Sequence, residues 1–266
     1  MESQYIATIR NLGPIRRLGQ NFLLDRSVAQ AEAAHAEGKV VLEVGPGLGI
    51  LTDELCRTAK KVIAVEKDRR LFEMLEANSE CRNLELINSD FFKADQGMIS
   101  GADIMISNIP YSISSPLLEW LYDKGMQAVL CLQKEFVERM LAQPGSSEYS
   151  KLSVMTALRC SVTYIMDVPR GSFYPVPKVD SAVVYLKPKE VNGTREDWRV
   201  IGLLMEHKKK TLRNALVDSR GALGLTKGKA RELAEDLGSL SEFRCFKLGP
   251  KELLSAAKSI APKIIK

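Results

Sequence analysis

The segment Asn108-Ile109-Pro110-Tyr111 follows an apolar run, Ile104–Ser107, and combines residue types that suit chemistry on a planar amine. Pro110 has no backbone N–H and restricts Ile109 towards extended conformations. The side-chain oxygen of Asn108 and a nearby backbone carbonyl are then directed outward as two hydrogen-bond acceptors, with the ring of Tyr111 beside them. This pattern predicts a site for the edge and face of a heterocycle that carries an amino group. The alternative is a turn with a buried tyrosine.

A glycine-rich turn is the second candidate site. The apolar, β-branched run Val40–Val44 predicts a buried strand, and Gly45, Gly47 and Gly49 follow it before helical spacing resumes. A strand, a tight turn and a helix N-terminus let the backbone approach a nucleotide-like ligand closely. About twenty residues further on, Glu66 ends the second apolar run, where a carboxylate can bind both hydroxyls of a ribose.

The glycine spacing bears on which cofactor this turn binds. Dinucleotide sites use G-x-G-x-x-G and place a pyrophosphate at the helix N-terminus. This chain has G-x-G-x-G preceded by an acidic residue, Glu43, which favours S-adenosylmethionine because that cofactor has no phosphate. A tight turn without a ligand is the alternative. Asp90, after the run Leu84–Ile87, is placed either to accept a hydrogen bond from an adenine amine or to cap a helix.

These residues need a framework that brings several strand ends together. Short apolar runs alternate with amphipathic segments, which predicts a doubly wound, parallel α/β sheet with ligands at the carboxyl ends of its strands. Strands are expected at Val40–Val44, Val62–Val65, Leu84–Ile87, Ile104–Ser107 and Ala128–Leu132. Helices are expected at Phe22–Ala36, around Leu51–Cys56, Arg69–Ala77 and Ile99, and near Ser115–Asp123, Lys134–Leu141 and Leu152–Cys160.

The end of the chain has a different pattern. Two late strands, Ser161–Val168 and Ser181–Leu186, predict a hairpin at the edge of the sheet. After Lys187-Pro188-Lys189 only helical spacing follows, at Asp197–Met205, Lys208–Val217, Gly228–Leu237 and Pro250–Ala261. The sequence therefore predicts two domains, an α/β domain over residues 1–188 and a small all-α domain over residues 189–266.

Charge is concentrated in this helical part. The 266-residue chain has a net charge of +5, and the segment from Glu206 to Lys229 contains seven basic and two acidic residues. That segment alone carries a surplus equal to the charge of the whole chain. It is either a solvated helix face or a surface that binds nucleic acid.

Composition limits the other classes of function. The five cysteines include no C-x-x-C pair, which indicates free thiols in a reducing cytosol. Two histidines are too few for a zinc site or for His-based catalysis, so no metal is expected. No apolar run is long enough to span a membrane, and the N-terminus has no apolar signal core. We therefore expect a cytoplasmic protein without a membrane partner.

Several motifs occur in the order and spacing of one protein family. They are Gly19-Gln20-Asn21-Phe22-Leu23, Glu43-Val44-Gly45-Pro46-Gly47, Glu66, Asp90, Asn108-Ile109-Pro110-Tyr111 and Phe173-Tyr174-Pro175-Val176-Pro177-Lys178-Val179-Asp180-Ser181. The chain resembles the ribosomal RNA adenine N6,N6-dimethyltransferases, which act near the 3′ end of small-subunit rRNA. The first and last motifs are specific, whereas class I methyltransferases share the glycine turn. The resemblance implies a class I, Rossmann-like fold and S-adenosylmethionine as cofactor.

The resemblance also implies roles for individual residues. The implied cofactor contacts are Gln20, Asn21, Leu23, Gly45, Gly47, Glu66, Asp90 and Asn108. The implied residues around the target base are Asn108, Ile109, Tyr111 and Phe173. A second aromatic ring is physically reasonable because a base taken out of its stack needs a new stacking partner. The alternative for Phe173, apart from the resemblance, is a loop residue that covers the core.

The expected partner is small-subunit rRNA in an immature ribosomal particle, bound by a monomer. Its phosphates are expected to contact Arg16, Arg17, Lys208, Lys209, Lys210 and Arg213. One alternative is a macrolide-resistance methyltransferase that modifies a large-subunit rRNA adenine. Another is a non-catalytic rRNA-binding assembly or transcription factor with the same fold. An NAD-dependent dehydrogenase is disfavoured by the glycine spacing.

Overall fold

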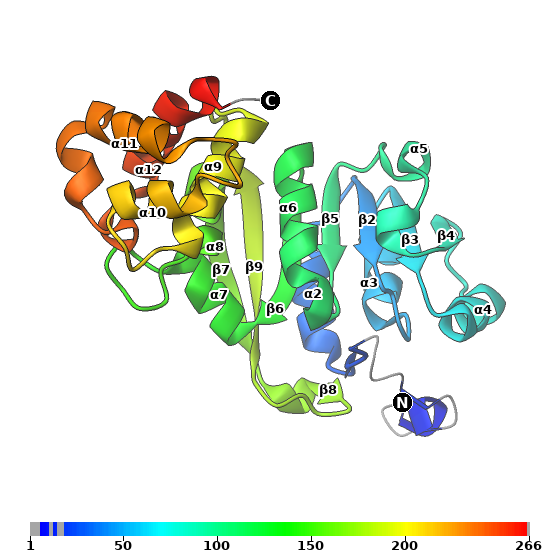
Figure 1. The fold of residues 1–266 in the computed structure, drawn as a ribbon. Coiled ribbons are helices and arrows are strands. Elements are labelled where there is room, and N and C mark those ends of the chain that lie inside the picture. Colours follow the sequence, from blue (N-terminus) through cyan, green and yellow to red (C-terminus); the bar gives the residue numbers. More distant parts are fainter. Residues whose placement is uncertain (1–5, 11–12, 15–18, 265–266) are drawn as a thin grey trace. The chain divides into compact units, whose positions relative to one another are not determined.

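Figure 1 shows the computed structural model of the chain, which describes residues 6–10, 13–14 and 19–264. The chain divides into two compact units. Unit 1 contains Met1–Val137 and Val162–Pro188, and unit 2 contains Glu138–Ser161 and Lys189–Lys266. The division expected after residue 188 coincides with one unit boundary. The segment Glu138–Ser161 was expected in the first domain, but it belongs to unit 2 because its helix packs against the C-terminal helices.

Unit 1 is built on a seven-stranded sheet with the order β4-β3-β2-β5-β6-β9-β7. Its strands are β2 (Val40–Val44), β3 (Lys61–Glu66), β4 (Leu84–Asn88), β5 (Ile104–Ser107), β6 (Gln127–Gln133), β7 (Cys160–Val168) and β9 (Ser181–Pro188). Strands β2 to β6 pair in parallel, and β9 pairs antiparallel with β6. The predicted doubly wound α/β fold is confirmed. The two late strands are neighbours, with β7 at the edge and β9 between β6 and β7.

The helices of unit 1 connect these strands. They are α2 (Arg26–Ala33), α3 (Ile50–Thr58), α4 (Arg69–Asn78), α5 (Gln96–Ile99), α6 (Ser114–Lys124) and the start of α7 (Lys134–Leu141). In Figure 1, α6 crosses one face of the sheet near β5 and β6. In the described part of the chain, no helix has the length and apolar character needed to cross a membrane.

The expected helix Phe22–Ala36 is wrong at its start. Phe22 and Leu23 form a two-residue strand, β1, which pairs antiparallel with β8 (Phe173–Tyr174). The helix begins only at Arg26, because the carboxylate of Asp25 accepts the Ser27 N–H and caps it. The helical spacing of this segment gave no indication of its contact with a segment about 150 residues away, because sequence periodicity reports only local structure.

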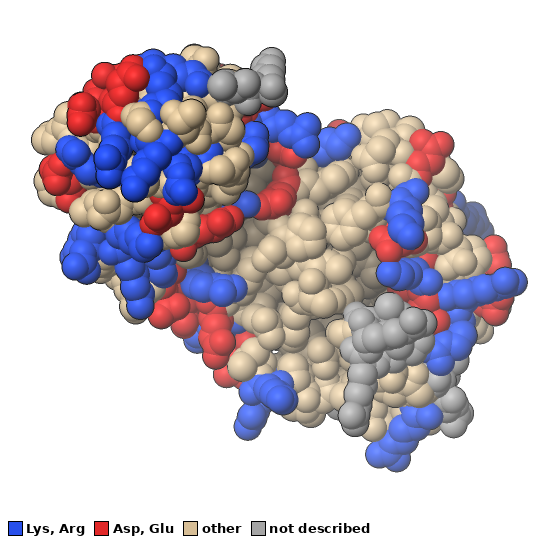
Figure 2. Space-filling view, viewed as in Figure 1, with Lys and Arg blue, Asp and Glu red and all other residues tan. Residues whose placement is uncertain are grey.

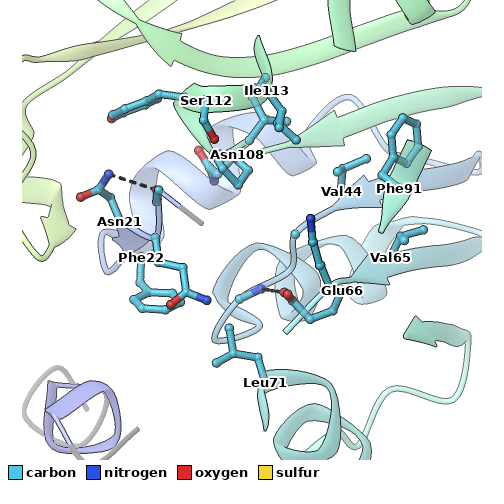
Figure 3. Close-up of a pocket in the computed structure, with 18 of the residues that line it drawn as sticks. Asn21, Phe22, Val44, Val65, Glu66, Leu71, Phe91, Asn108, Ser112 and Ile113 are labelled. Carbon is cyan, nitrogen blue, oxygen red and sulfur yellow. Dashed lines mark hydrogen bonds between the residues drawn. The ribbon is translucent and has the colours of Figure 1, made fainter. Parts of the chain in front are cut away.

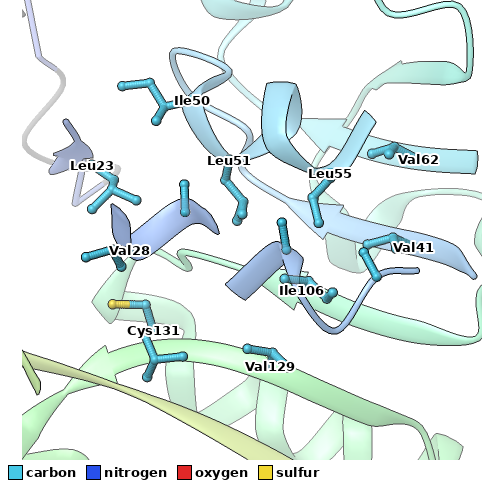
Figure 4. Packing of buried hydrophobic residues seen from close by; sticks show 14 of the residues in the cluster. Leu23, Val28, Val41, Ile50, Leu51, Leu55, Val62, Ile106, Val129 and Cys131 are labelled. Carbon is cyan, nitrogen blue, oxygen red and sulfur yellow. The ribbon is translucent and has the colours of Figure 1, made fainter. Parts of the chain in front are cut away.

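The core beside the candidate sites lies between α2, α3 and one face of the sheet (Figure 4). Alternate residues of β2, β5 and β6 point to this face, as the two-residue period of a strand requires. Each fully buried aliphatic side chain contributes about 1.5–3 kcal/mol. The cluster includes Val28, Ala29, Ala33, Val41, Ile50, Leu51, Leu55, Ile104, Ile106, Val129, Cys131 and Phe173.

Unit 2 is helical. Its helices are α8 (Lys151–Arg159), α9 (Arg195–Glu206), α10 (Leu212–Ser219), α11 (Lys227–Asp236) and α12 (Pro250–Ile260). The expected helix Lys208–Val217 begins four residues later than predicted, because the hydroxyl of Thr211 accepts the Asn214 N–H and caps α10. The three consecutive lysines 208–210 therefore precede this helix.

The turn between β2 and α3 depends on glycine. Gly49 is the N-cap of α3 and has φ +84°, a left-handed conformation that other residues rarely adopt. A Cβ atom at this position would lie 2.7 Å from Cδ2 of Leu75, so a side chain also lacks space. The alternate glycines noted in the sequence thus hold α3 close behind β2, where a helix N-terminus faces the carboxyl edge of the sheet.

Replacing Gly49 with alanine is expected to lower the free energy of unfolding by at least about 1–2 kcal/mol, the cost of a left-handed alanine. Urea denaturation monitored by circular dichroism measures this loss. The control is Gly228→Ala in α11, where φ is not positive and a new Cβ would meet no atom within 4 Å. That variant is expected to gain about 0.4–1 kcal/mol. Wild-type stability of Gly49→Ala would contradict the role given to this turn.

Candidate active site

A cavity of about 210 Å³ opens at the carboxyl ends of β2, β3 and β5 in unit 1 (Figure 3). Parallel strands end at a common edge, so the loops after them meet there. The structure brings together, around this cavity, the predicted residues Gln20, Asn21, Gly45, Gly47, Glu66, Asp90, Asn108, Ile109, Tyr111 and Phe173. Leu23 is the exception: its side chain is buried in the core and does not line the cavity.

Glu66, the last residue of β3, ties the glycine turn to the sheet. Its carboxylate accepts the N–H of Gly47 at 3.2 Å and the N–H of Asp68 at 2.8 Å. The side chain is 5% exposed, and burial raises its pKa despite these two hydrogen bonds. Each carboxylate oxygen keeps a further acceptor position. Glu66 therefore both fixes the turn and offers acceptors to hydroxyl groups in the cavity.

Gln20 reaches the cavity from the segment before β1. Its amide Nε2 donates to Asp68 Oδ2 at 2.9 Å, and the same carboxylate is bound by two nitrogens of Arg70 at 3.0 and 2.7 Å. The Arg70 guanidinium holds the pKa of Asp68 below its usual range. Asn21 donates to the carbonyl of Gly19 at 3.3 Å. Gln20 thus attaches the segment before β1 to the loop after β3 at the rim of the cavity.

Asp90 caps a helical turn, one of the two roles considered for it from the sequence, and it also lines the cavity. Its Oδ1 accepts the Phe92 N–H at 3.1 Å, and its Oδ2 lies 2.7 Å from the Lys67 ammonium. The hydrogen bond from Lys67 lowers the pKa of Asp90, so the carboxylate is ionised at neutral pH. The remaining acceptor capacity faces the cavity that it lines.

Asn108 carries the most informative polar group of the site. Its amide nitrogen donates to Glu32 Oε2 at 2.9 Å, whereas its Oδ1 is buried and has no hydrogen-bond partner within the described residues. A buried acceptor without a partner costs about 1–3 kcal/mol, so such atoms usually mark a site for a ligand or water. Pro110 follows, without an N–H to compete for that oxygen. Asn108 therefore keeps one acceptor that no described residue occupies.

Glu32 was missed by the sequence interpretation. It lies near the end of α2, is fully buried, and comes four residues after Val28 on the same face of the helix. An acidic residue on the apolar face of an amphipathic helix is the signal that could have identified it. Its partner, Asn108, lies 76 residues further along the chain.

Two aromatic residues complete the cavity. The hydroxyl of Tyr111 is 2.7 Å from the Ser181 hydroxyl at the start of β9, and burial raises the pKa of Tyr111 to about 12. Phe173 in β8 is 3% exposed, and it packs in the core cluster while it lines the cavity. The pairing of Leu23 with Phe173 fixes β8 beside β1. Leu23 thus acts on the site through the backbone that places Phe173.

The predicted RNA-binding cations differ in their surroundings. Arg16 and Arg17 lie outside the described residues. The ammonium of Lys208 donates to the carbonyls of Ser147 and Tyr149, both at 2.8 Å, so it joins two segments within unit 2. Lys210 pairs with Asp218, and Arg213 pairs with Glu242. Lys209 is exposed, and it has no ion pair among the described residues.

The comparisons with known proteins identify the family of the chain. A family model described as "Ribosomal RNA adenine dimethylase" matches residues 15–235 of the chain. The chain belongs to this family. The resemblance noted from the motifs is therefore confirmed, and the dimethylase is an enzyme of the methyltransferase class.

Named relatives match nearly the whole length of the chain. A protein of Thermococcus kodakarensis, named probable ribosomal RNA small subunit methyltransferase A, is 41% identical over 253 residues, which are 92% of this chain and 89% of the relative. A protein of the same name from Methanopyrus kandleri is 40% identical and covers 97% of each chain.

Solved structures of other proteins also resemble the structure of this chain. A dimethyladenosine transferase from Plasmodium falciparum has a TM-score of 0.75 and 31% identity, and covers 88% of this chain and 95% of its own. The 23S rRNA methyltransferase ErmE has a TM-score of 0.60 and 26% identity, and covers 90% of this chain and 99% of its own. The predicted class I methyltransferase fold is confirmed by these neighbours.

Two fully buried glutamates near the site make stability depend on pH. Burial raises the pKa of Glu32 and of Glu43 to about 8 in each case, although hydrogen bonds from Asn108 and Thr52 oppose the shift. The folded protein therefore holds these protons at a pH where the unfolded chain has lost them. The favourable contribution of these two carboxyl groups to the free energy of unfolding is complete below pH 4.5, the pKa of a glutamate in the unfolded chain. It decreases as the pH rises towards about 8, their pKa in the folded protein.

The free energy of unfolding of the wild type is expected to fall relative to that of Glu43→Gln as the pH rises from about 5 to 8. Glutamine keeps an acceptor for Thr52 but cannot ionise, so the variant lacks the Glu43 contribution. Urea titrations at several pH values measure the difference. Glu37→Gln, at an exposed position, is the control and should follow the wild-type profile. Parallel profiles for wild type and Glu43→Gln would show that burial does not perturb this carboxyl group.

Proposed function

We propose that the protein transfers methyl groups from S-adenosylmethionine to the N6 atoms of two adjacent adenosines near the 3′ end of small-subunit rRNA. The observation that carries this proposal is the buried Oδ1 of Asn108, which has no partner among the described residues and belongs to a residue that lines the cavity together with Glu66 and the glycine turn. An acceptor of this kind suits the amine of a base. The names of the relatives support the small subunit as the source of that base.

The residues present fit the proposed cofactor. Glu66 has acceptor capacity for two ribose hydroxyls, and Asp90 can accept a hydrogen bond from an adenine amine. Gly47 has φ +60°, and a Cβ there would lie 3.1 Å from the ring of Phe22, so the turn beside the cavity has no room for a side chain. When bound, S-adenosylmethionine supplies an electrophilic methyl group on a positively charged sulfur.

The chain's own residues would activate the acceptor nitrogen by position and polarity. The exocyclic nitrogen of adenine is a poor nucleophile because its lone pair is delocalised into the ring. Asn108 Oδ1 accepts one of its hydrogens, and a backbone carbonyl of the same motif accepts the other. This favours a pyramidal nitrogen whose lone pair is free for attack, and it stabilises the positive charge that develops.

Tyr111 and Phe173 act by stacking on the base and not by transferring a proton. Stacking on an aromatic ring is worth about 1–3 kcal/mol per base, which offsets the loss of stacking in RNA. With a pKa of about 12, the Tyr111 hydroxyl stays protonated at neutral pH and is not a general base. The ammonium formed when the nitrogen takes the methyl group is a strong acid, so its proton can leave to water without a dedicated base. Orientation of the nitrogen then provides most of the acceleration.

The partner proposed for unit 2 is the rRNA backbone. Figure 2 shows Lys and Arg side chains gathered on the part of this unit formed by α10 and α11. Such a surface positions RNA through its phosphates without reading its sequence. We propose that it binds an immature small ribosomal subunit in the cytoplasm and that the protein acts as a monomer.

The assay that tests this function offers labelled S-adenosylmethionine with immature small subunits, large subunits or no particle. Two methyl groups on each of two adjacent adenosines of the small-subunit rRNA are expected, as mapped by mass spectrometry. Methylation of one large-subunit adenine would favour the macrolide-resistance alternative, and the ErmE neighbour is named as a 23S rRNA methyltransferase. Binding without any methyl transfer would favour an assembly factor.

Asn108→Ala is expected to lower kcat about 100- to 1,000-fold while the Kd for S-adenosylmethionine changes less than about threefold. The reason is that Oδ1 is needed for the developing charge on the nitrogen. Rapid-quench methylation and isothermal titration calorimetry measure the two quantities. Equal losses in both would mean that Asn108 only holds the cofactor.

Lys209→Glu is expected to weaken binding to immature small subunits severalfold and to reduce the slope of log K against log salt by about 1. Lys209 is chosen because Lys208 supports the fold of unit 2. Lys60→Glu makes the same change of charge at the amino end of β3 and should leave binding unchanged. If both variants bind like the wild type, the lysines 208–210 are a solvated surface.

A further inference from the structure

A carboxyl group buried behind the cavity has no role in the function proposed above. Glu32 is 0% exposed on the face of α2 that packs against α3 and β5, among the aliphatic residues of the core. A buried carboxyl group is costly unless it is hydrogen-bonded, so a fold that needed only packing would place an aliphatic residue there. Its retention in the core requires a contact that an aliphatic side chain does not make.

That contact is with Asn108. The amide Nδ2 of Asn108 donates to Glu32 Oε2 at 2.9 Å, and it is the one hydrogen-bond partner of this carboxyl group among the described residues. The other carboxyl oxygen, Oε1, is buried without a partner within the same residues. The two residues come from α2 and from the loop after β5, and α2 packs directly against β5.

The consequence lies in the geometry of an amide. A side-chain amide has its donor nitrogen and its acceptor oxygen in one plane, on opposite sides of the Cβ–Cγ bond axis, so fixing the nitrogen also fixes the oxygen. In Asn108 the nitrogen is held by Glu32, and the oxygen is the end left without a partner. A rotated amide would instead present its NH₂ group to the cavity, where it would face the hydrogens of an adenine amine.

We propose that Glu32 is a positioning residue, which holds the Asn108 amide in the one orientation that offers its oxygen to the target amine. This inference rests on the function proposed above. Glu32 does not touch the substrate and acts only through Asn108. Either protonation state has an oxygen that accepts from Nδ2, so the orientation holds whether or not the carboxyl group is ionised.

A reciprocal exchange of donor and acceptor tests the proposal. Glu32→Gln keeps an acceptor and should retain kcat within about threefold, whereas Glu32→Leu should lose about 100-fold, the effect of removing one preorganised contact. Asn108→Asp places a second carboxyl group against Glu32 and should lose at least about 100-fold. In Glu32→Gln/Asn108→Asp, the glutamine amide donates to one oxygen of the aspartate, and the other oxygen of the aspartate stays directed towards the amine. We expect this double variant to exceed Asn108→Asp at least about tenfold.

A matched control separates positioning from a general effect of removing buried charge. Glu43 is also fully buried, but it accepts its hydrogen bond from Thr52 and not from Asn108. Glu43→Gln/Asn108→Asp should therefore show no recovery over Asn108→Asp. Recovery in this control as well, or no recovery in Glu32→Gln/Asn108→Asp, would overturn the proposal. The test does not depend on Glu32→Leu, so a folding defect in that variant leaves the conclusion intact.

A second measurement needs neither RNA nor cofactor. In ¹⁵N-labelled full-length protein, the side-chain amide signals of Asn108 are assigned by their loss in Asn108→Asp. A hydrogen bond to Glu32 should shift one of these amide protons and slow its exchange, and Glu32→Leu should abolish both effects. An Asn108 amide that is unchanged in Glu32→Leu would contradict the contact. If the wild type does not methylate small subunits but the amide behaves as expected, the proposed function fails while the contact stands.

Discussion

The structure depends on a buried hydrogen-bond acceptor that the protein itself leaves unsatisfied. Asn108 Oδ1 is buried without a hydrogen-bond partner among the described residues, and the amide nitrogen of Asn108 donates to Glu32, so the oxygen keeps its acceptor capacity beside the cavity that Asn108 lines. In such an environment an acceptor interacts more strongly than in water, and it does not have to reorganise when charge develops. Keeping this atom in place constrains the sheet below it, the helix behind it and the loops around it.

Two long-range arrangements meet that constraint. The parallel strands β2, β3 and β5 end at one edge, which places the glycine turn, Glu66 and Asn108 around a common cavity. The short antiparallel pair of β1 and β8 closes the cavity on another side and carries Phe173 into it. Hydrogen bonds from Gly47 to Glu66 and from Asn108 to Glu32 then lock the loops to the sheet and to α2. Most of the site is thus rigid before any ligand arrives.

The sequence predicted the elements that a local pattern of residues encodes. Val40–Val44 and Ile104–Ser107 were found with the observed bounds, because buried parallel strands are continuous apolar runs between turns. The start of the first helix was wrong because pairing of Phe22 with Tyr174 leaves no local pattern. Glu32 was missed for a similar reason, since its partner is distant in sequence. The role of Lys208 within unit 2 could be recognised only in the structure, because in a sequence a lysine that donates to backbone carbonyls looks like any other basic residue.

The most direct test of this account is a crystal structure of the protein with S-adenosylhomocysteine and an adenosine-containing oligonucleotide from small-subunit rRNA. The account predicts the N6 atom of the target adenine within about 3 Å of Asn108 Oδ1, a hydrogen-bond distance. The base should stack against Tyr111 or Phe173, with the ribose of the cofactor on Glu66. A base bound elsewhere, or an Asn108 amide that turns its nitrogen to the base and its oxygen to Glu32, would contradict it.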